Sequence, residues 1–384
     1  MGEINIMDLV ELWTIQLILF CQWMVCASAD THWTYTGSTS QAQWPEVFPH
    51  CGGTEQSPIN VETSQVQHDP SLTPVQPLGY NQPGNNPFTL TNNGHTVEMS
   101  LPVWMGVGGL PWHFTAAQLH LHWGSSEVNG VARTGGSEHT INGHCSAAEL
   151  HIVHYNSDVY PNISTARTER NGLAVLGVLI ETGDETNSAF ANIFNYLGRI
   201  RYKGQRVSIP AFDVGSLLPN DLGRFFRYNG SLTTPPCYQS VLWTVFSEKV
   251  KVSHAQLRKL ETVLFSNEKE GLDSVPLRDN HREPQALNGR LVLASFTADS
   301  LTIYSVGEVC AMAIGTVCGC LGLALIVRVI VKTIRSTSSW DVLPTVRSTS
   351  SPRAKETNQE KKEDVVFKTT SDSEKEEVPP HSEP

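Results

Sequence analysis

Two segments in the middle of the chain alternate between polar and apolar residues. Ala117–Trp123 (AQLHLHW) and Ala148–Ile152 (AELHI) both have the two-residue period of a strand with one buried face. Because alternate residues of a strand point the same way, His120 and His122 share one face. A second strand beside the first would add His151 to that face. The pattern therefore predicts adjacent strands on which three imidazoles converge.

The region from Thr31 to Phe296 has the composition of one folded domain. It is rich in Gly, Pro and Trp and supports a loop-rich β protein, although 384 residues would suffice for two average domains. The net charge of -11 and the lack of a basic stripe with interleaved aromatic residues exclude a nucleic-acid binder. From periodicity alone, the fold class is β-rich.

The N-terminus has the pattern of a secretory signal. An apolar run, Leu12–Val25, is followed by the small residues ASA at positions 27–29, which predicts a signal peptide over residues 1–29 and cleavage before Asp30. The residues before the run are acidic rather than basic, so an uncleaved anchor is the alternative. The cleaved form places an extracellular domain at residues 30–298.

A second apolar run predicts a transmembrane helix. Val309–Val331 is long enough to cross a bilayer and contains one charge, Arg328, near its end. Lys332 and Arg335 follow, and this basic flank places the C-terminal side in the cytoplasm. We therefore expect a single-pass type I protein of the plasma membrane with a short connector at residues 299–308.

The segments around this helix add two expectations. Residues 332–384 are rich in Ser, Thr, Pro and charge, which predicts a disordered cytoplasmic tail whose hydroxyls are candidate phosphorylation sites. Gly315 and Gly319 form a GxxxG pair that would let two helices approach closely, so a homodimer is one option.

Cysteines and sequons fit an exported domain. Of eight cysteines, two leave with the signal and three lie in the predicted membrane segment, so Cys51, Cys145 and Cys237 remain outside and allow three possible disulfide pairings. Asn162 begins a glycosylation sequon in an expected loop. Asn229 begins another, closer to the histidine region, so we expect sugar first at Asn162.

Three neutral imidazoles with a fourth position open to water describe a catalytic zinc site. A lone HxH pair is weak evidence, because strand histidines often only form hydrogen bonds in a core. His139, His144 and His154 fit that structural role, since His154 lies three residues from His151 and so faces the other side of its strand. The ligand hypothesis is therefore restricted to His120, His122 and His151, with Zn²⁺ as cofactor.

Several longer segments resemble the α-class carbonic anhydrases, in that family's order. The matching stretches are HWTYTG, EQSPIN, NNGHTV, QLHLHWG, GSEHTING, AELHIVHYN, GLAVLGVLIE and YNGSLTTPPCYQSVLWTVF. They extend over the whole predicted ectodomain, and the order of signal, domain, helix and tail resembles the transmembrane subgroup. The resemblance implies a zinc enzyme that hydrates carbon dioxide to bicarbonate.

The resemblance also assigns roles around the metal. It matches His120, His122 and His151 to the zinc ligands and Gln118 and Glu149 to groups that orient the imidazoles. It further matches Thr233 to the threonine that orients the attacking oxygen and donates its own proton to a carboxylate, here Glu138.

Substrate and proton positions follow in the same way. The resemblance implies an apolar carbon dioxide pocket with one polar neighbour, made of Val153, Val175, Leu232, Trp243 and Thr234. It implies a proton shuttle at His95, whose unperturbed pKa near 6.5 suits neutral pH, and a water-ordering path formed by Tyr35, Asn93 and Glu98. Glu98 and His281 depart from the family pattern, which commonly has a neutral amide and a tryptophan there.

For the fold, the resemblance implies a twisted, mostly antiparallel sheet of about ten strands with short peripheral helices, and a Cys51–Cys237 disulfide that leaves Cys145 free. The main alternative function is a catalytically weak ectodomain used for binding or adhesion. A zinc peptidase is disfavoured because the chain has no HExxH motif.

Overall fold

The structure of the protein is a computed structural model, which describes residues 32–125, 127–128, 131–132, 135–270, 274–297 and 306–337. Two units, residues 1–303 and 304–384, are described separately below. The predicted signal peptide, most of the predicted connector and the tail beyond Thr337 lie outside the described residues.

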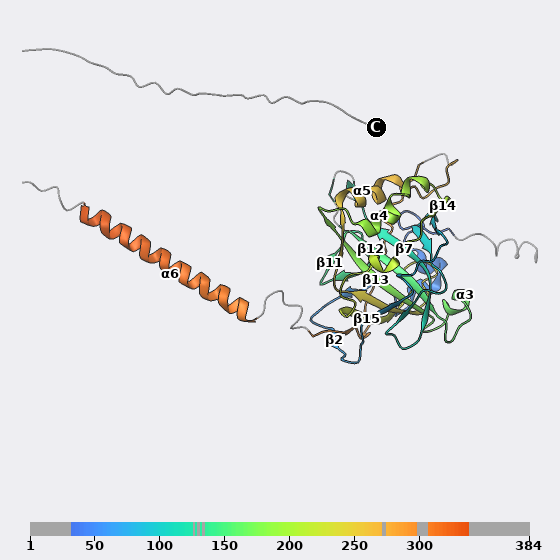
Figure 1. Cartoon of the computed structure of the whole chain (residues 1–384), viewed down its shortest axis with the longest axis horizontal. Coiled ribbons are helices and arrows are strands. Elements are labelled where there is room, and N and C mark those ends of the chain that lie inside the picture. Colours follow the sequence, from blue (N-terminus) through green and yellow to red (C-terminus); the bar gives the residue numbers. More distant parts are fainter. Residues whose placement is uncertain are drawn as a thin grey trace, which may run out of the picture. The chain divides into compact units, whose positions relative to one another are not determined.

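One large sheet forms the centre of the first unit (Figure 1). Ten strands follow one another across it, in the spatial order β14 (Arg206–Ile209), β4 (Phe88–Asn92), β5 (Val97–Ser100), β7 (Phe114–Trp123), β12 (Ala148–Asn156), β13 (Leu173–Gly183), β16 (Val241–Phe246), β15 (Phe225–Gly230), β18 (Leu293–Ala294) and β2 (Gln67–His68). Pairing along this path is antiparallel except at β13–β16 and β18–β2, which confirms a mostly antiparallel sheet.

Three short strands bring the sheet to thirteen, beyond the expected ten. They are β3 (Gln76–Leu78), β6 (Gly106–Gly108) and β17 (Val250–Ser253). The first two contain Pro or Gly, which are rare inside strands, so they lack a recognisable strand pattern. Two small sheets complete the β structure: β1 (Asn60–Val61), β10 (Thr140–Ile141) and β11 (His144–Cys145) form one, and β8 (Glu127–Val128) and β9 (Val131–Ala132) form the other.

The helices in the described part of the first unit are short and peripheral, as expected. They are α2 (Trp44–Val47), η1 (Pro49–Gly52), α3 (Ile163–Ala166), α4 (Ser188–Phe194), η2 (Leu197–Arg199), η3 (Val214–Leu217) and α5 (His254–Val263). Helix α5 begins at a capping box in which the Ser253 and Gln256 side chains each accept a backbone N–H of the other residue. Helices α4 and α5 pack Phe190, Ile193 and Leu260 into the larger core cluster.

The two faces of β12 serve different purposes. Leu150 and Ile152 point into the larger core cluster, whereas Val153 belongs to a second cluster on the opposite face. His151 lies on the side of Val153, because residues two apart in a strand share a face. The alternation in the sequence therefore separates a structural face from the face that holds the histidines.

His154 lies on the core face, as expected from its spacing. Its Nε2 lies 2.6 Å from the buried hydroxyl of Tyr80, and its Nδ1 lies 3.3 Å from the carbonyl oxygen of Ala174. Burial lowers the pKa of His154 to about 4. The hydrogen bonds of the ring to backbone carbonyl oxygens act in the opposite direction and raise this pKa.

We expect this histidine to make the protein sensitive to acid. The pKa of His154 is near 6.5 in the unfolded chain and about 4 in the folded one, so the unfolded state binds more protons between these values. The free energy of unfolding should fall by up to about 3 kcal/mol as the pH falls through that window. Denaturant titrations at several pH values should show a shallower pH slope for His154→Gln than for the wild type.

The matched control for this prediction is His144→Gln, because His144 is exposed and belongs to the small sheet. Its pH slope should equal that of the wild type. Equal slopes for the wild type and His154→Gln would show that His154 does not cause the acid sensitivity.

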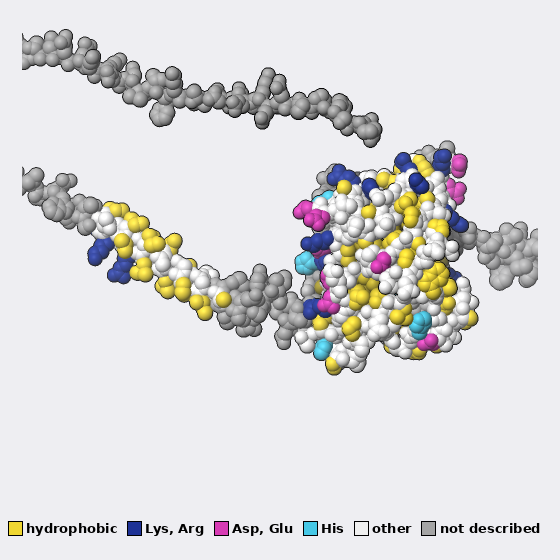
Figure 2. Space-filling view, viewed as in Figure 1, with side chains coloured by type: hydrophobic (Ala, Val, Ile, Leu, Met, Phe, Trp, Pro, Cys, Tyr) yellow, Lys and Arg dark blue, Asp and Glu magenta, His cyan; other side chains and the backbone are white. Residues whose placement is uncertain are grey.

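The described part of the second unit is one long helix, α6 (Val306–Thr337). Its segment Ala313–Arg335 is apolar and long enough to cross a membrane, since 23 residues rise about 35 Å as a helix. Figure 2 shows mainly hydrophobic side chains along it, with Lys and Arg at one end. The helix contains the whole predicted segment Val309–Val331 and continues beyond it at both ends. Lys332 and Arg335 continue the helix because basic residues are favourable near a helix C-terminus.

The predicted disulfide is present. Cys51 in η1 is bonded to Cys237, which follows Thr233 in the same loop, and both cysteines pack against Trp44. Cys145 is free and exposed. Of the three pairings that the sequence left open, the structure therefore selects the one implied by the family resemblance.

Candidate metal centre

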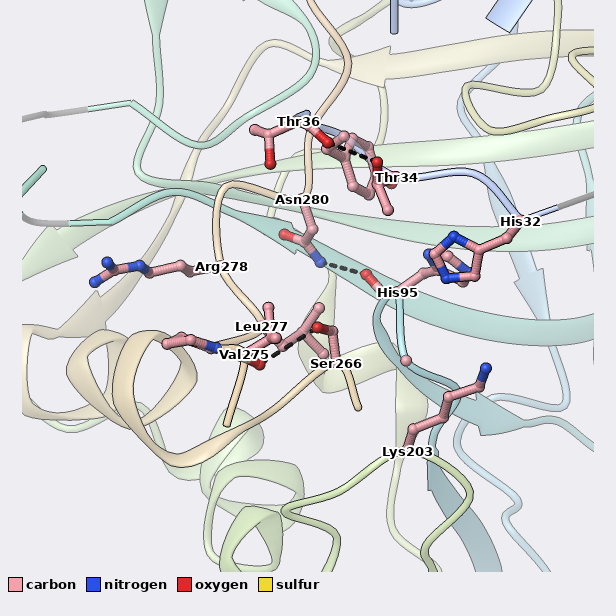
Figure 3. A pocket seen from close by; sticks show the side chains of 13 residues that line it. His32, Thr34, Thr36, His95, Lys203, Ser266, Val275, Leu277, Arg278 and Asn280 are labelled. Atoms are coloured by element: carbon pink, nitrogen blue, oxygen red, sulfur yellow. Dashed lines mark hydrogen bonds between the residues drawn. The ribbon is translucent and has the colours of Figure 1, made fainter. Parts of the chain in front are cut away.

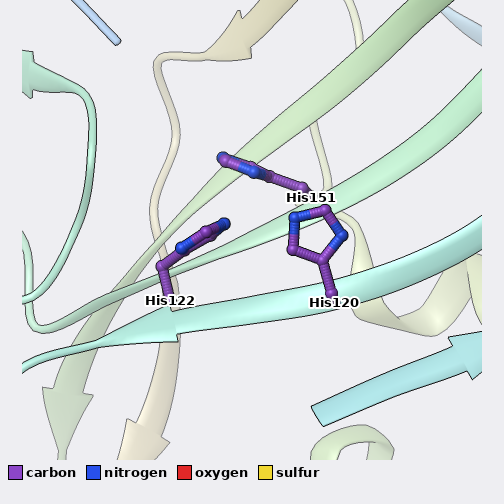
Figure 4. A group of neighbouring side chains, drawn as sticks. All are labelled: His120, His122 and His151. Atoms are coloured by element: carbon purple, nitrogen blue, oxygen red, sulfur yellow. The ribbon is translucent and has the colours of Figure 1, made fainter. Parts of the chain in front are cut away.

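Three histidines meet on one face of the sheet (Figure 4). His120 and His122 come from β7 and His151 from β12, and the strand register places His120 directly opposite His151. The ring centroids lie 5.0, 5.2 and 4.6 Å apart for the pairs His120–His122, His120–His151 and His122–His151. One nitrogen from each ring lies within 4.8 Å of the other two. The arrangement predicted from the two alternating segments is thus formed.

The remaining nitrogen of each ring faces an oxygen acceptor. His120 Nδ1 lies 2.9 Å from Gln118 Oε1, His122 Nδ1 lies 2.7 Å from the carbonyl oxygen of Asn280, and His151 Nε2 lies 2.7 Å from Glu149 Oε1. A neutral imidazole has one N–H donor, and these acceptors place the hydrogen on the outer nitrogen. The inner nitrogens are therefore left with lone pairs directed at the common centre.

The burial of the three rings keeps them neutral. Burial lowers the pKa of His122 to about 4, and it lowers the pKa of His120 and His151 as well, with repulsion between the rings adding to the effect. His122 Nε2 is buried and has no hydrogen-bond partner among the described residues. An orphaned lone pair beside two others fits a cation with nitrogen ligands, and three such donors suit zinc with an open fourth position.

Glu149 connects this site to a second histidine. Its carboxylate accepts from the backbone N–H groups of Glu138 and His139, and it lies 2.7 Å from both His139 Nδ1 and His151 Nε2. Burial alone would raise the pKa of Glu149, but attraction to the two histidines and their hydrogen bonds lower it well below its usual range. His139, Glu149 and His151 thus form a hydrogen-bonded chain that fixes the His151 ring.

Gly177 provides the room for the Glu149 carboxylate. It lies opposite His151 in the pairing of β12 with β13. A Cβ atom there would lie 3.2 Å from Glu149 Oε1 and 3.5 Å from Cγ2 of Val245. A larger residue would therefore displace the acceptor that holds His151.

Glu138 and Thr233 are both buried next to the imidazoles. Glu138 Oε1 accepts from the backbone N–H of Arg282 at 2.9 Å and lies 3.3 Å from His122 Nδ1. Burial and the charge of Glu149 raise the pKa of Glu138, while His151, the Thr233 hydroxyl and the Arg282 N–H oppose this change. Oε2 of Glu138 has no partner with hydrogen-bond geometry among the described residues, so this oxygen is available to accept a hydrogen bond.

An apolar wall adjoins the histidines. Val153, Val175 and Trp243 are paired side by side across β12, β13 and β16, and all three are buried. The Trp243 ring lies 4.8 Å from the His151 ring, between centroids, and Leu232 packs against the same cluster. Thr234 is partly exposed, and its carbonyl oxygen accepts from the N–H of Cys237. The site therefore has a dry side next to a polar one.

Comparison with known proteins decides the family. Residues 39–296 match the eukaryotic-type carbonic anhydrases. The chain belongs to this family. Human carbonic anhydrase 12 is 43% identical over 300 residues, which cover 77% of this chain and 82% of that protein. Human carbonic anhydrase 6 is 38% identical over 71% of this chain and 86% of its own, and mouse carbonic anhydrase 1 is 38% identical over 70% and 100%.

Family membership makes the chain an enzyme of the carbonic anhydrase type, and hydration of carbon dioxide is the reaction of that family. The family is zinc-dependent in general, and the three-histidine group of this chain fits that metal by its donor set and its orphaned nitrogen.

His95 lies in the carbonic anhydrase domain in a more buried setting than the sequence suggests. Its ring stacks on Trp33, with centroids 3.9 Å apart and planes 10° apart. Burial, followed by repulsion from Lys203 and His32, lowers its pKa to about 4. In this conformation the ring is therefore a weaker base than an unperturbed histidine.

The residues expected to order water near His95 are Asn93, Glu98 and Tyr35. The Asn93 side chain accepts from the backbone N–H groups of His95 and Thr96, which holds the turn between β4 and β5. Burial raises the pKa of Glu98, and a hydrogen bond with Asn93 partly offsets this. Tyr35 lies beside Trp33, and burial raises its pKa well above 10.

The sequence pattern missed one residue of the site, Asn280. Its carbonyl oxygen accepts from His122, its Oδ1 accepts from the Trp123 N–H, and its amide donates to the His95 carbonyl oxygen. A backbone carbonyl has no side-chain signature, so only the fold could reveal this contact. His281, one of the two departures from the family pattern, is the residue after Asn280. Its Nδ1 lies 3.4 Å from the Trp123 carbonyl oxygen.

Proposed function

We propose that this chain hydrates carbon dioxide to bicarbonate and a proton at the outer face of the plasma membrane, and so serves pH and bicarbonate homeostasis. One Zn²⁺ would be held by His120, His122 and His151. The observation that supports this most is the set of three imidazoles whose outer nitrogens are each fixed by an oxygen acceptor, so that three lone pairs converge.

Zinc at this position would lower the pKa of a bound water and so supply hydroxide at neutral pH. Gln118, Glu149 and the Asn280 carbonyl oxygen hold the ligand tautomers, as outer partners of metal-bound histidines do. Val153, Val175 and Trp243 supply an apolar surface for carbon dioxide, which has no net dipole.

Thr233 and Glu138 would orient the attacking oxygen. An ionised carboxylate only accepts hydrogen bonds, so a Thr233 hydroxyl that donates to Glu138 must turn its lone pairs toward the metal. The orphaned Oε2 of Glu138 and the influence of Thr233 on the pKa of Glu138 support this assignment. Fixing the direction of attack is a form of orientational catalysis.

A purely adhesive or binding role would not require these groups. All three histidines, their acceptors, Thr233 and Glu138 are present and buried or half-buried together. We therefore propose catalysis as the function. A folded protein that does not accelerate carbon dioxide hydration would instead indicate a role in binding alone.

The proposed topology is type I, with α6 in the membrane and the carbonic anhydrase domain outside. Intact cells should hydrate carbon dioxide supplied in the medium without being permeabilised. Antibodies to the tail beyond Thr337 should bind only after permeabilisation. The basic residues that follow the apolar part of α6 are the physical reason, because such residues favour the cytoplasmic side. Tail labelling on unpermeabilised cells would reverse the orientation.

The proposal also includes a glycan on the extracellular domain and a homodimer formed through the membrane helix. Asn162 is exposed as the N-cap of α3, where a sugar meets no steric barrier from the core, so we place the glycan there. Gly315 and Gly319 remain the basis for a homodimer through α6.

His95 is the proposed proton shuttle. Its stacked ring is a weak base, so the shuttle would act when the ring leaves Trp33 and regains a pKa closer to 6.5. We expect His95→Ala to slow turnover in dilute buffer by about one order of magnitude, less than a typical acid–base group because buffer and water offer other routes. kcat/KM for hydration should change little, since carbon dioxide attack does not use this ring.

Stopped-flow hydration in weakly buffered solution measures this effect. Added imidazole should restore the lost turnover in His95→Ala. Equal turnover for variant and wild type would show that protons leave by another route, with Glu98 as the next group to replace.

A further inference from the structure

The predicted mature N-terminus has a sequence suited to a transition-metal ion. Cleavage before Asp30 leaves Asp30, Thr31 and His32 as the first residues of the chain. The free α-amino group, the next two backbone nitrogens and Nδ1 of a histidine in third place can surround one ion, because they close small chelate rings that adjoin one another. Four nitrogens in one plane are the ligands that Cu²⁺ and Ni²⁺ prefer.

Each of these positions meets a requirement of the chemistry. A histidine in second place would bring only one amide nitrogen with it, whereas His32 brings two. Thr31 has a backbone N–H whose proton can be displaced by the metal, and proline at that position would lack it. Asp30 presents a primary amine once the signal peptide is removed. The order of residues therefore provides the whole ligand set within one short segment.

The fold leaves His32 available for this role. Asp30 and Thr31 lie outside the described residues, whereas His32 lies within them and is exposed. Among the described residues, neither the backbone N–H of His32 nor its imidazole ring has a hydrogen-bond partner. Both nitrogens that His32 would contribute are thus unused by the folded domain.

The chain is anchored immediately after His32. The Trp33 ring stacks on His95, with centroids 3.9 Å apart, and meets the Trp44 ring edge-on at 5.2 Å. The carbonyl oxygen of Thr34 accepts from the Trp44 indole N–H at 3.0 Å. A metal bound at His32 would therefore lie next to a fixed indole ring, and binding requires no rearrangement of these contacts.

The charges around His32 favour this binding mode over an ion held by imidazoles alone. His32, His95 and Lys203 line one cavity of about 280 Å³, and the Lys203 ammonium group points toward both rings (Figure 3). A divalent ion held only by neutral side chains would place its full charge near this ammonium group. Two deprotonated amide nitrogens cancel the charge of Cu²⁺, so the complex with four nitrogens is not repelled.

We propose that the α-amino group of Asp30, the amide nitrogens of Thr31 and His32, and Nδ1 of His32 bind one Cu²⁺ or Ni²⁺ ion in a square plane. Binding breaks two amide N–H bonds and, where the amine is protonated, one ammonium N–H bond. Four nitrogen–metal bonds form, the protons go to solvent, and the metal remains divalent. The site rests on cleavage of the signal peptide before Asp30 and is separate from the three-histidine centre.

Titration of the full-length protein with Cu²⁺ tests this site. The protein is produced in secretory cells, purified in detergent, and its N-terminal residue is identified by mass spectrometry. Zn²⁺ is present throughout, because it fills the three-histidine centre and competes less well than Cu²⁺ for nitrogen ligands. One equivalent of Cu²⁺ should give the paramagnetic resonance spectrum of a square plane with four nitrogens and should quench tryptophan fluorescence. The apparent affinity should rise with pH, because binding releases protons.

Two pairs of variants identify the ligands. His32→Ala should weaken Cu²⁺ binding by more than about 100-fold, the upper end of the loss caused by removing an outer partner of a metal ligand. His68→Ala is its matched control, since His68 is an exposed histidine in β2. Thr31→Pro should abolish the spectrum with four nitrogens although it keeps His32, whereas Thr31→Ala should retain it.

Several results would overturn the copper site. They are a mature chain that does not begin at Asp30, equal Cu²⁺ affinities in the wild type and His32→Ala, or an unchanged spectrum in Thr31→Pro. Zinc content and hydration are measured on the same samples and decide the proposed function separately. An inactive protein that binds Cu²⁺ as described would contradict the proposed function alone, and an active protein without this spectrum would contradict the copper site alone.

Discussion

Replacing His122 with alanine should remove the metal and nearly abolish carbon dioxide hydration. His122 is 1% exposed, its buried Nε2 has no hydrogen-bond partner among the residues that the structure describes, and its Nδ1 is fixed by the Asn280 carbonyl oxygen. Loss of an outer partner of a ligand typically lowers metal affinity by about 10- to 100-fold, so loss of the ligand itself should exceed about 100-fold. Metal analysis after dialysis and stopped-flow hydration measure the two effects on the same sample.

The control for this variant is His144→Ala. His144 is exposed, and its ring contacts only the Asn142 carbonyl oxygen among the hydrogen-bond partners described. It should retain zinc and activity. Thermal unfolding of both variants would show whether the fold survives. A folded His122→Ala protein with full zinc content and a full hydration rate would exclude His122 as a ligand.

Thr233→Ala should retain zinc and still lose most of the rate. The residue is 5% exposed and acts on Glu138 rather than on the three imidazoles, so metal affinity should change little. Loss of a group that orients or stabilises the reacting oxygen commonly lowers kcat by about 10²- to 10³-fold. We expect kcat and kcat/KM to fall together, the signature of an interaction made in the transition state.

Thr233→Ser provides the matched comparison because it keeps the hydroxyl group and removes only a methyl group. It should recover most of the rate lost in Thr233→Ala. Unchanged turnover in the alanine variant, or an equal loss in both variants, would show that the hydroxyl does not orient the attack.

The central site could be predicted from the sequence because its geometry is local. The two-residue period of β7 places His120 and His122 on one face, and the pairing with β12 adds His151 at the position opposite His120. Gln118 and Glu149 lie two residues from the histidines they hold, within the same strands. Such relations follow from strand geometry once the strands are recognised.

Contacts between distant segments could not be predicted in this way. The Asn280 carbonyl oxygen reaches His122 across 158 positions of the chain, and a carbonyl group gives no residue-type signal. Trp33 lies far from His95 in the sequence, so neither their stacking nor the lowered pKa of His95 was visible beforehand. Pro and Gly interrupt the strands β3 and β6. These residues keep the two strands short and leave them without an alternating pattern.

The disulfide pairing could be predicted from the family resemblance but not from the cysteine count alone. The cysteine count left three pairings, and the family resemblance selected Cys51–Cys237, which the structure contains. In the chain-entropy view, closing a loop of 186 residues contributes on the order of 5 kcal/mol to stability. In the folded protein, the bond also ties the loop that contains Thr233 and Cys237 to η1.

The most direct measurement is zinc content together with carbon dioxide hydration by the purified full-length protein. The protein should contain one Zn²⁺ per chain, lose hydration activity when a chelator removes the metal, and regain it when Zn²⁺ is restored. A correctly folded protein that binds no zinc, or whose hydration rate in the stopped flow equals the uncatalysed rate with zinc bound, would contradict the assignment of this site as a working carbonic anhydrase centre.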